Sequence, residues 1–167
     1  MKPLFIGRFQ PFHNAHLEIV RRFAPISERF IIGVGSSQLH HTKENPFTFE
    51  ERDRMIRDSL DSENIKNYKI YAIPDINNYP KWVAHVTSIV PEFDVVLARN
   101  PTTIKLFEEK GYRVKTLPLF YGEECKGSEI RRKIVHDEDW QRLVPKSVAK
   151  VIREMDGIER IKRLYKE

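Results

Sequence analysis

Five short apolar segments, each followed by polar residues and then by a helical pattern, constrain the fold of this chain more than any other feature. The apolar segments span residues 4–6, 30–34, 68–73, 93–98 and 112–117. Helical patterns begin near residue 13, cover 49–60, 80–90 and 101–110, and fill most of 128–164. Strands that alternate with helices form a parallel sheet with right-handed crossovers. We therefore predict an α/β, doubly wound (Rossmann-like) fold with a five-stranded parallel sheet and C-terminal helices.

The length and composition suit one domain. The 167 residues can bury one core, so we expect a single domain over 1–167, with an α/β core at 1–125 and helices at 126–167. Hydrophobic residues make up 40 % and charged residues 32 %, a soluble globular balance. No run approaches the roughly 20 apolar residues that span a bilayer, so no membrane partner is expected. The single cysteine suits a reducing cytoplasm, which is the predicted location.

Polar residues follow each predicted strand. They are Gly7 and Arg8, Ser36 and Ser37, Asp75, Asn100, and the segment 126–131. In a parallel sheet, ligands bind beyond the carboxyl ends of the strands. Although these residues are scattered along the sequence, we expect them to converge at one edge of the sheet.

The segment 4–16, LFIGRFQPFHNAH, carries the strongest chemical signal. His13 and His16 lie three residues apart where a helix begins, so both imidazoles share one face beside backbone N–H groups without helical partners. With Arg8, this predicts a polyphosphate site. Two alternatives stay open. The histidines are compatible with a metal site, although structural zinc needs four ligands and Cys125 is the only cysteine, and they are compatible with a purely structural role.

The segment 126–132, KGSEIRR, also opens a predicted helix. We expect Arg131 and Arg132 in its first turn, where the helix dipole disfavours cations by about 0.3–1 kcal/mol. A bound anion would make the position of the arginines favourable instead of unfavourable. Ser128 offers a hydroxyl and an N–H to the same anion. A solvated basic helix face is the alternative explanation.

Together, the two segments resemble the signatures of the nucleotidylyltransferase superfamily, and residues 8–13 resemble the form found in archaeal-type nicotinamide-nucleotide adenylyltransferases. The resemblance covers nearly the whole chain. It implies transfer of the adenylyl group of ATP to nicotinamide mononucleotide (NMN), giving NAD and pyrophosphate. The attack is in line on the α-phosphorus without a covalent intermediate, because the acceptor phosphate is already ionised.

The resemblance also implies roles for individual residues. His13, His16, Arg8 and Arg131 are the expected catalytic residues, and the expected ATP-binding residues are Gly7, Arg8, Phe9, His13, His16, Asn100, Lys126, Ser128 and Arg131. We expect no metal-ligating side chains, because Mg²⁺ keeps waters and binds substrate phosphates. The expected acceptor-binding residues are Ser36, His41, Lys43, Phe47, Asp75 and Trp82. Trp82 is expected to stack on the pyridinium ring and Asp75 to bind the ribose; a core position for Trp82 and a turn cap at Asp75 are the structural alternatives.

Three positions depart from the family pattern. Ala15 stands where a glycine is usual, Glu44 where an arginine is common, and Arg99 where a small residue is expected. Ala15 narrows the site by one methyl group. Glu44 leaves the contact to the acceptor phosphate to Lys43.

Other functions stay open from the sequence. The nearest is a sister enzyme for another phosphorylated acceptor, such as phosphopantetheine or FMN. A nucleic-acid-binding module is a second alternative. This chain shows no basic stripe interleaved with aromatic residues, so no nucleic-acid partner is expected. A third alternative is a relative of aminoacyl-tRNA synthetases, but this chain is too short to include a tRNA-binding domain. The family resemblance implies a homo-oligomer such as a hexamer.

Overall fold

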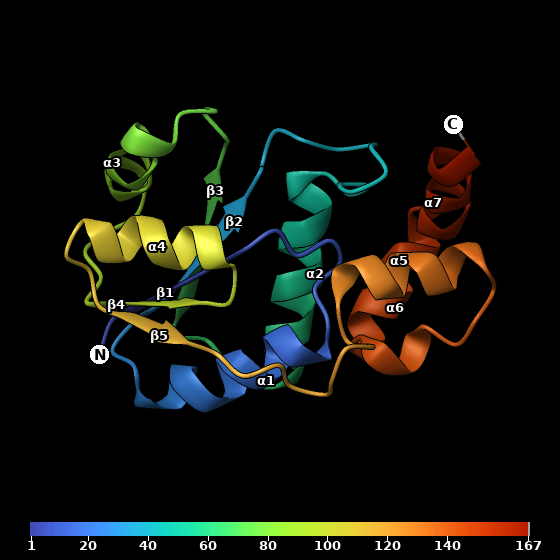
Figure 1. The fold of residues 1–167 in the computed structure, drawn as a ribbon. Coiled ribbons are helices and arrows are strands. Elements are labelled where there is room, and N and C mark those ends of the chain that lie inside the picture. The colour runs from blue at the N-terminus through green and yellow to red at the C-terminus, as the bar shows by residue number, and fades with distance from the viewer. Residues whose placement is uncertain (167) are drawn as a thin grey trace.

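The computed structural model describes residues 1–166 as five parallel strands flanked by helices (Figure 1). The strands are β1 (Pro3–Gly7), β2 (Phe30–Gly35), β3 (Tyr68–Ile73), β4 (Val95–Ala98) and β5 (Val114–Thr116), in the order β3-β2-β1-β4-β5. All four neighbouring pairs are parallel. The predicted doubly wound, five-stranded parallel sheet is therefore confirmed.

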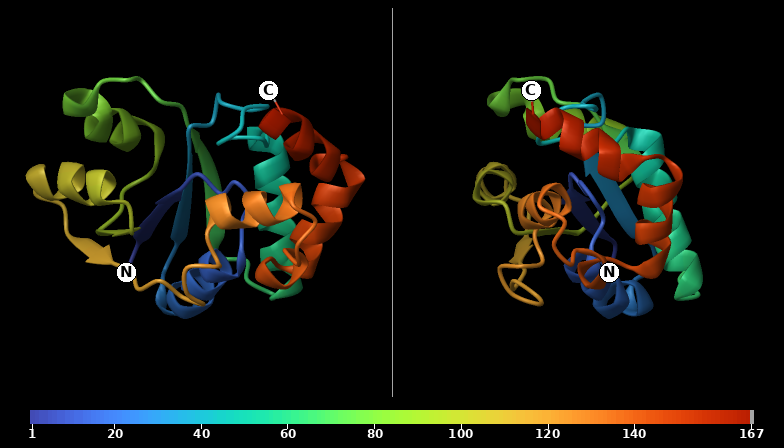
Figure 2. Two further views of the ribbon diagram at one scale, coloured as in Figure 1. Left: turned by 45° about the vertical axis from the view of Figure 1, so that its right-hand side comes forward. Right: turned by 90° about the vertical axis from the view of Figure 1, so that its right-hand side faces the viewer.

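Helices cover both faces of the sheet. They are α1 (Asn14–Phe23), α2 (Phe49–Ser62), α3 (Tyr79–Ile89), α4 (Pro101–Glu109), α5 (Gly127–Val135), α6 (Lys146–Glu154) and α7 (Gly157–Lys166), with short 3₁₀ turns at Ala24–Ile26 and Gln141–Leu143. Figure 2 shows α3 and α4 on one side of the sheet and α2, α6 and α7 on the other. No helix among residues 1–166 is long and apolar enough to cross a membrane.

Successive strand residues point to opposite faces of the sheet, so the core divides into two hydrophobic clusters, one on each face. Leu4, Ile31 and Val96 pack with α3 and α4, whereas Phe5 and Ile32 pack with the helices of the other face. That second cluster includes residues of α5, α6 and α7 as well as of α1 and α2. The C-terminal helices therefore share a core with the strands, and the predicted division at residue 125 remains a prediction.

Several predicted boundaries differ from the observed ones. The strands expected to begin at Phe93 and Tyr112 begin two residues later, and these two rings stack on each other just before the strands with centroids 5.1 Å apart. The helical pattern of 128–164 divides into α5, α6 and α7. Asp137 and Asp156, both with positive φ, lie in the turns that follow α5 and α6.

The carboxyl ends of the strands are level. Gly7 pairs with Val34, Gly35 with Ile73, and Ala98 with Thr116. The loops after β1, β2, β3 and β4 consequently leave the sheet at one edge. The order of the strands reverses on either side of β1, and such a switch point is where doubly wound sheets bind ligands.

Candidate active site

Two adjoining cavities open at this edge of the sheet. The first, of about 420 Å³, contains both motif histidines and is called the histidine cavity. The second, of about 400 Å³, contains Trp82 and is called the tryptophan cavity. Their shared wall consists of Ile6, Gly7, Arg8 and Asn100. A ligand in one cavity can therefore meet a ligand in the other beside Arg8.

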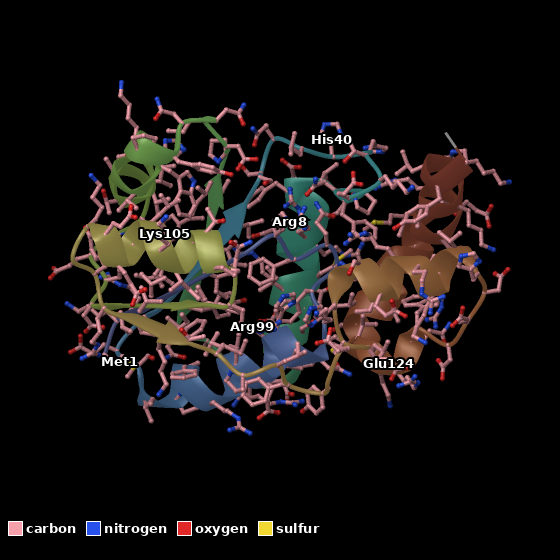
Figure 3. The ribbon with its side chains drawn as sticks, in the orientation of Figure 1. Met1, Arg8, His40, Arg99, Lys105 and Glu124 are labelled. Carbon is pink, nitrogen blue, oxygen red and sulfur yellow. The ribbon has the colours of Figure 1, made fainter. Side chains whose placement is uncertain are left out.

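The histidine cavity is strongly cationic. All nine residues expected to bind ATP line it, from Gly7 to Arg131. Arg8, Arg99, Lys126 and Arg131 contribute four cations, and no Asp or Glu is among the lining residues. Figure 3 shows Arg8 and Arg99 in the middle of the molecule, at the carboxyl edge of the sheet. A cavity with this charge suits a polyanion.

The two histidines form a reciprocal cap at the start of α1. The backbone N–H of His16 donates to Nδ1 of His13 over 3.4 Å, and the N–H of His13 donates to Nδ1 of His16 over 3.1 Å. Their rings stack with centroids 3.5 Å apart. Because each Nδ1 accepts a hydrogen bond, the proton of each neutral ring lies on Nε2. Both imidazoles thus retain an Nε2–H donor.

Burial keeps both rings neutral. Desolvation, and next the positive charge of Arg99, lower the pKa of His13 to about 3. Desolvation, His13 and Arg99 lower the pKa of His16 well below its usual value. Aromatic rings surround His16, with the centroids of Phe9 and Phe12 at 4.7 and 5.5 Å. At neutral pH the pair therefore supplies hydrogen-bond donors without net charge.

Helix α5 brings Arg131 into the histidine cavity. Nη1 of this buried side chain donates to the Gln10 carbonyl over 2.8 Å, whereas Nε has no partner among residues 1–166. Gly127 permits this approach, because an added Cβ would lie 2.9 Å from Nη1 and 3.2 Å from the Gln10 oxygen. No side chain caps α5 at Lys126. This end of the cavity has donors left for a ligand.

The expected place of Arg131 and Arg132 in the first turn is wrong. The helix begins at Gly127, which puts both arginines in the second turn. They point in different directions, since Arg132 pairs with Glu129 and Glu138 over 2.7 and 2.8 Å at the surface. The solvated-face explanation therefore fits Arg132, and burial rather than the helix dipole distinguishes Arg131.

The tryptophan cavity brings together Ser36, Asp75 and Trp82. The hydroxyl of Ser36 donates to Oδ2 of Asp75 over 2.8 Å. Gln38 brackets the Asp75 backbone, accepting from its N–H at 3.0 Å and donating to its carbonyl at 3.2 Å. Trp82 is half-buried and meets Phe107 edge to face at 5.5 Å, so it lines the cavity and also packs on the core.

Three other residues expected at the acceptor site lie outside both cavities. Phe47 is fully buried in the core, and its backbone exchanges hydrogen bonds of 2.9 and 3.0 Å with the Gln10 side chain. Lys43 lies over the Tyr165 ring at 4.9 Å. His41 is exposed beside His40, with their Nδ1 atoms 2.9 Å apart. These three side chains therefore do not meet Ser36, Asp75 and Trp82 in the tryptophan cavity, and their role at the acceptor stays a prediction.

Several lining residues are not among the predicted site residues. They are Asn77, Asn78, Tyr79, Thr102, Thr103 and Leu106 in the tryptophan cavity, and Pro118, Leu119 and Phe120 in the histidine cavity. Except for Leu106, which lies within α4, they are in loops or at a helix start, where no periodic pattern marks them. Ala15 and Arg99, noted only as departures, also line the histidine cavity. Glu44 is exposed and lines neither cavity.

A doubly wound sheet with a cationic, histidine-capped cavity at its switch point defines a nucleotidyltransferase, and residues 4–133 match the cytidylyltransferase-like family. The chain is 47 % identical to the nicotinamide-nucleotide adenylyltransferase of Thermoplasma volcanium, over 98 % of this chain and 92 % of that protein. It is 44 % identical to the enzyme of that name from Picrophilus torridus, over 98 % and 97 %. The chain belongs to the nicotinamide-nucleotide adenylyltransferase family, which confirms the resemblance inferred from the two motifs.

Solved structures share the fold. A bifunctional NMN adenylyltransferase/ADP ribose pyrophosphatase from Francisella tularensis, complexed with AMP and a manganese ion, superposes with a TM-score of 0.76 at 22 % identity. The match covers 97 % of this chain and 52 % of that one. At this identity the likeness supports the fold alone.

Proposed function

We propose that this chain transfers the adenylyl group of ATP to nicotinamide mononucleotide, giving NAD and pyrophosphate. The observation that carries the proposal is the pair of cavities that adjoin at Arg8, one cationic and one with Trp82 and Asp75. Two substrates must meet for the transfer, and adjoining cavities provide that geometry. Relatives named for this activity match nearly the whole chain.

In this proposal, ATP occupies the histidine cavity and the chain acts mainly by positioning and charge stabilisation. The acceptor phosphate attacks the α-phosphorus in line, the bond to the β-phosphate oxygen breaks, and pyrophosphate leaves. No general base is needed, because a phosphate monoester is largely ionised at neutral pH. The task of the protein is to stabilise charge on the phosphate oxygens in the transition state.

Each motif supplies part of that stabilisation. The Nε2–H groups of His13 and His16 donate to phosphate oxygens, and the Arg131 guanidinium places a positive charge beside them. Arg8, at the shared wall, is placed to contact phosphates of both substrates. Lys126 and Ser128, at the uncapped start of α5, complete the site for the phosphate chain.

The tryptophan cavity is proposed to hold the acceptor. Trp82 offers the face of an indole to the pyridinium ring, which is an attractive cation–π arrangement. Asp75, oriented by Ser36 and Gln38, is placed to accept a hydrogen bond from the ribose. His41, Lys43 and Phe47 have no part in this proposal as the loop now lies.

We propose that the divalent cation is Mg²⁺ and that the substrate phosphates, rather than protein side chains, hold it in the site. No group of three His, Cys, Asp or Glu side chains among residues 1–166 is arranged to hold a metal ion. Mg²⁺ is commonly bound by substrate phosphates and water. When bound, the cation would neutralise charge on the phosphates. Arg8 and Arg131 would contact the same phosphates directly.

We propose a cytoplasmic location because the single cysteine suits a reducing compartment, and a homo-oligomer such as a hexamer on the family resemblance. Light scattering on the purified chain tests the oligomer. The mass of one chain, 19.8 kDa, would contradict it.

The decisive experiment measures pyrophosphate release from ATP and Mg²⁺ with NMN, phosphopantetheine or FMN offered separately. We expect release with NMN, accompanied by NAD. Release with another acceptor only would keep the ATP site and overturn the assignment of the tryptophan cavity. No release with any acceptor would overturn the proposed transfer.

A further inference from the structure

Arg52 has the largest side chain among the fully buried residues, with 0 % of its surface exposed, and it belongs to neither motif of the site. Its guanidinium donates only to backbone carbonyls. Nε donates to Thr48 over 3.1 Å, Nη1 to Arg8 and Gly35 over 3.0 Å each, and Nη2 to Ser36, Ser37 and Leu39 over 3.3–3.4 Å. No ion pair formed within residues 1–166 includes Arg52.

The start of α2 explains how Arg52 reaches these carbonyls. Thr48 and Glu51 form a capping box: the Glu51 N–H donates to the Thr48 hydroxyl over 3.1 Å, and the Thr48 N–H donates to the Glu51 carboxylate over 2.8 Å. Arg52 follows in the first turns, and helical side chains lean toward the helix N-terminus. The guanidinium therefore lies below the loops that leave β1 and β2.

Those loops carry residues of both cavities. Arg8 lines both, and Gly35 and Ser36 line the tryptophan cavity. One guanidinium thus joins the backbone carbonyl of Arg8 to that of Ser36, and the side-chain hydroxyl of Ser36 donates to Asp75. Three of the bonds come from Nη2, so the planar fork of arginine matches this set of acceptors better than a lysine ammonium does.

The buried Arg52 side chain keeps its positive charge. Desolvation, and next the charge of Arg8, lower the pKa of Arg52 to about 10, so it stays cationic at neutral pH. Burying a cation without a carboxylate partner is costly. Here the six backbone carbonyls that the guanidinium satisfies offset part of that cost, and five of them belong to the loops that carry cavity residues.

We propose that Arg52 is a positioning residue for adenylyl transfer, which sets Arg8 and Ser36 in register at the junction of the two cavities. The inference rests on the proposed function. Because Gly35 and Ser36 line only the tryptophan cavity, loss of the fork displaces the acceptor side more than the ATP side.

The test compares Arg52→Lys and Arg52→Gln with the wild type. The matched control is Arg57→Lys on the same helix, since Arg57 is exposed and pairs with Asp53 over 2.9 Å. KM for NMN and KM for ATP are measured at a temperature at which circular dichroism shows each variant folded. A purely structural loss lowers the active fraction and leaves both KM values unchanged, so their ratio reports positioning.

We expect the ratio of KM(NMN) to KM(ATP) to rise about tenfold or more in both Arg52 variants, in keeping with the cost of a misplacement near 1 Å. The control should retain the wild-type ratio. An unchanged ratio in folded Arg52 variants overturns the proposal, and so does failure of both to fold, which would make Arg52 a folding residue. Wild-type protein that makes no NAD would instead overturn the proposed function.

Discussion

His13 and His16 cap the first turn of α1 for each other, each Nδ1 accepting the backbone N–H of the other residue. This single arrangement has two effects. It satisfies two backbone donors at a buried helix start, and it sets both neutral rings in the Nε2–H tautomer. The histidines are consequently both a structural cap and a pair of donors in the cationic cavity.

His16→Ala should lower turnover by about 10²–10³, because it removes one preorganised donor to the phosphates. Loss of the cap should cost about 1 kcal/mol of stability and loss of the packed ring more, so turnover is measured at a temperature at which the variant is folded. Steady-state NAD formation and thermal unfolding measure the two effects. His40→Ala is the control, since His40 is exposed and lines neither cavity. Wild-type turnover of His16→Ala would contradict the phosphate-site assignment.

The buried neutral histidines should make stability depend on pH. Their folded pKa values lie below the ordinary 6.5, at about 3 for His13. The unfolded chain therefore binds more protons, and the free energy of unfolding should fall as pH decreases from 6.5 toward 3. The slope approaches about 1.4 kcal/mol per pH unit for each histidine.

Urea unfolding at a series of pH values measures this slope. His16→Asn is the comparison, because the amide oxygen can still accept the His13 N–H while one titrating group is lost. Carboxylates titrate in both proteins, so the difference between the two curves isolates His16. Identical acid slopes would show that His16 is not buried as a neutral ring.

Arg131→Ala and Arg132→Ala form a matched pair on one helix. The first removes a buried cation from the histidine cavity, and turnover should fall by at least about 10². The second removes surface ion pairs with Glu129 and Glu138, which should change stability little and leave turnover unchanged, because exposed ion pairs contribute little. The two NAD formation rates provide the measurement. Equal losses in both variants would argue against a specific role for Arg131.

Trp82→Ala should weaken acceptor binding more than ATP binding. Loss of the indole face removes a cation–π contact worth about 0.5–2 kcal/mol, so KM for NMN should rise about three- to thirtyfold. KM for ATP should change little, because Trp82 does not line the histidine cavity. Trp82→Phe keeps an aromatic ring against Phe107 and should recover part of the loss. A rise in KM for ATP alone would place the nicotinamide elsewhere.

Local sequence patterns predicted most of the fold because local interactions specify it. The apolar segments at 30–34 and 68–73 form β2 and β3, and Thr48 and Asn100 cap α2 and α4 as their sequences indicate. Parallel strands must end at one edge of the sheet. For this reason the polar residues after the strands, including Arg8, Ser36 and Asp75, converge although they are far apart in the sequence.

Which side chains face the cavities was decided only by tertiary contacts. Adjacent residues such as Arg131 and Arg132 look alike in sequence, yet packing on Gln10 buries one, and surface carboxylates hold the other. In the same way, the bonds of Gln10 to Phe47 place a residue expected at the acceptor into the core. The two contacts of Gln10 join residues 37 and 121 positions apart. The sequence by itself therefore determined the strands, the caps and the motifs, and the loop paths were left to long-range hydrogen bonds that no local pattern encodes.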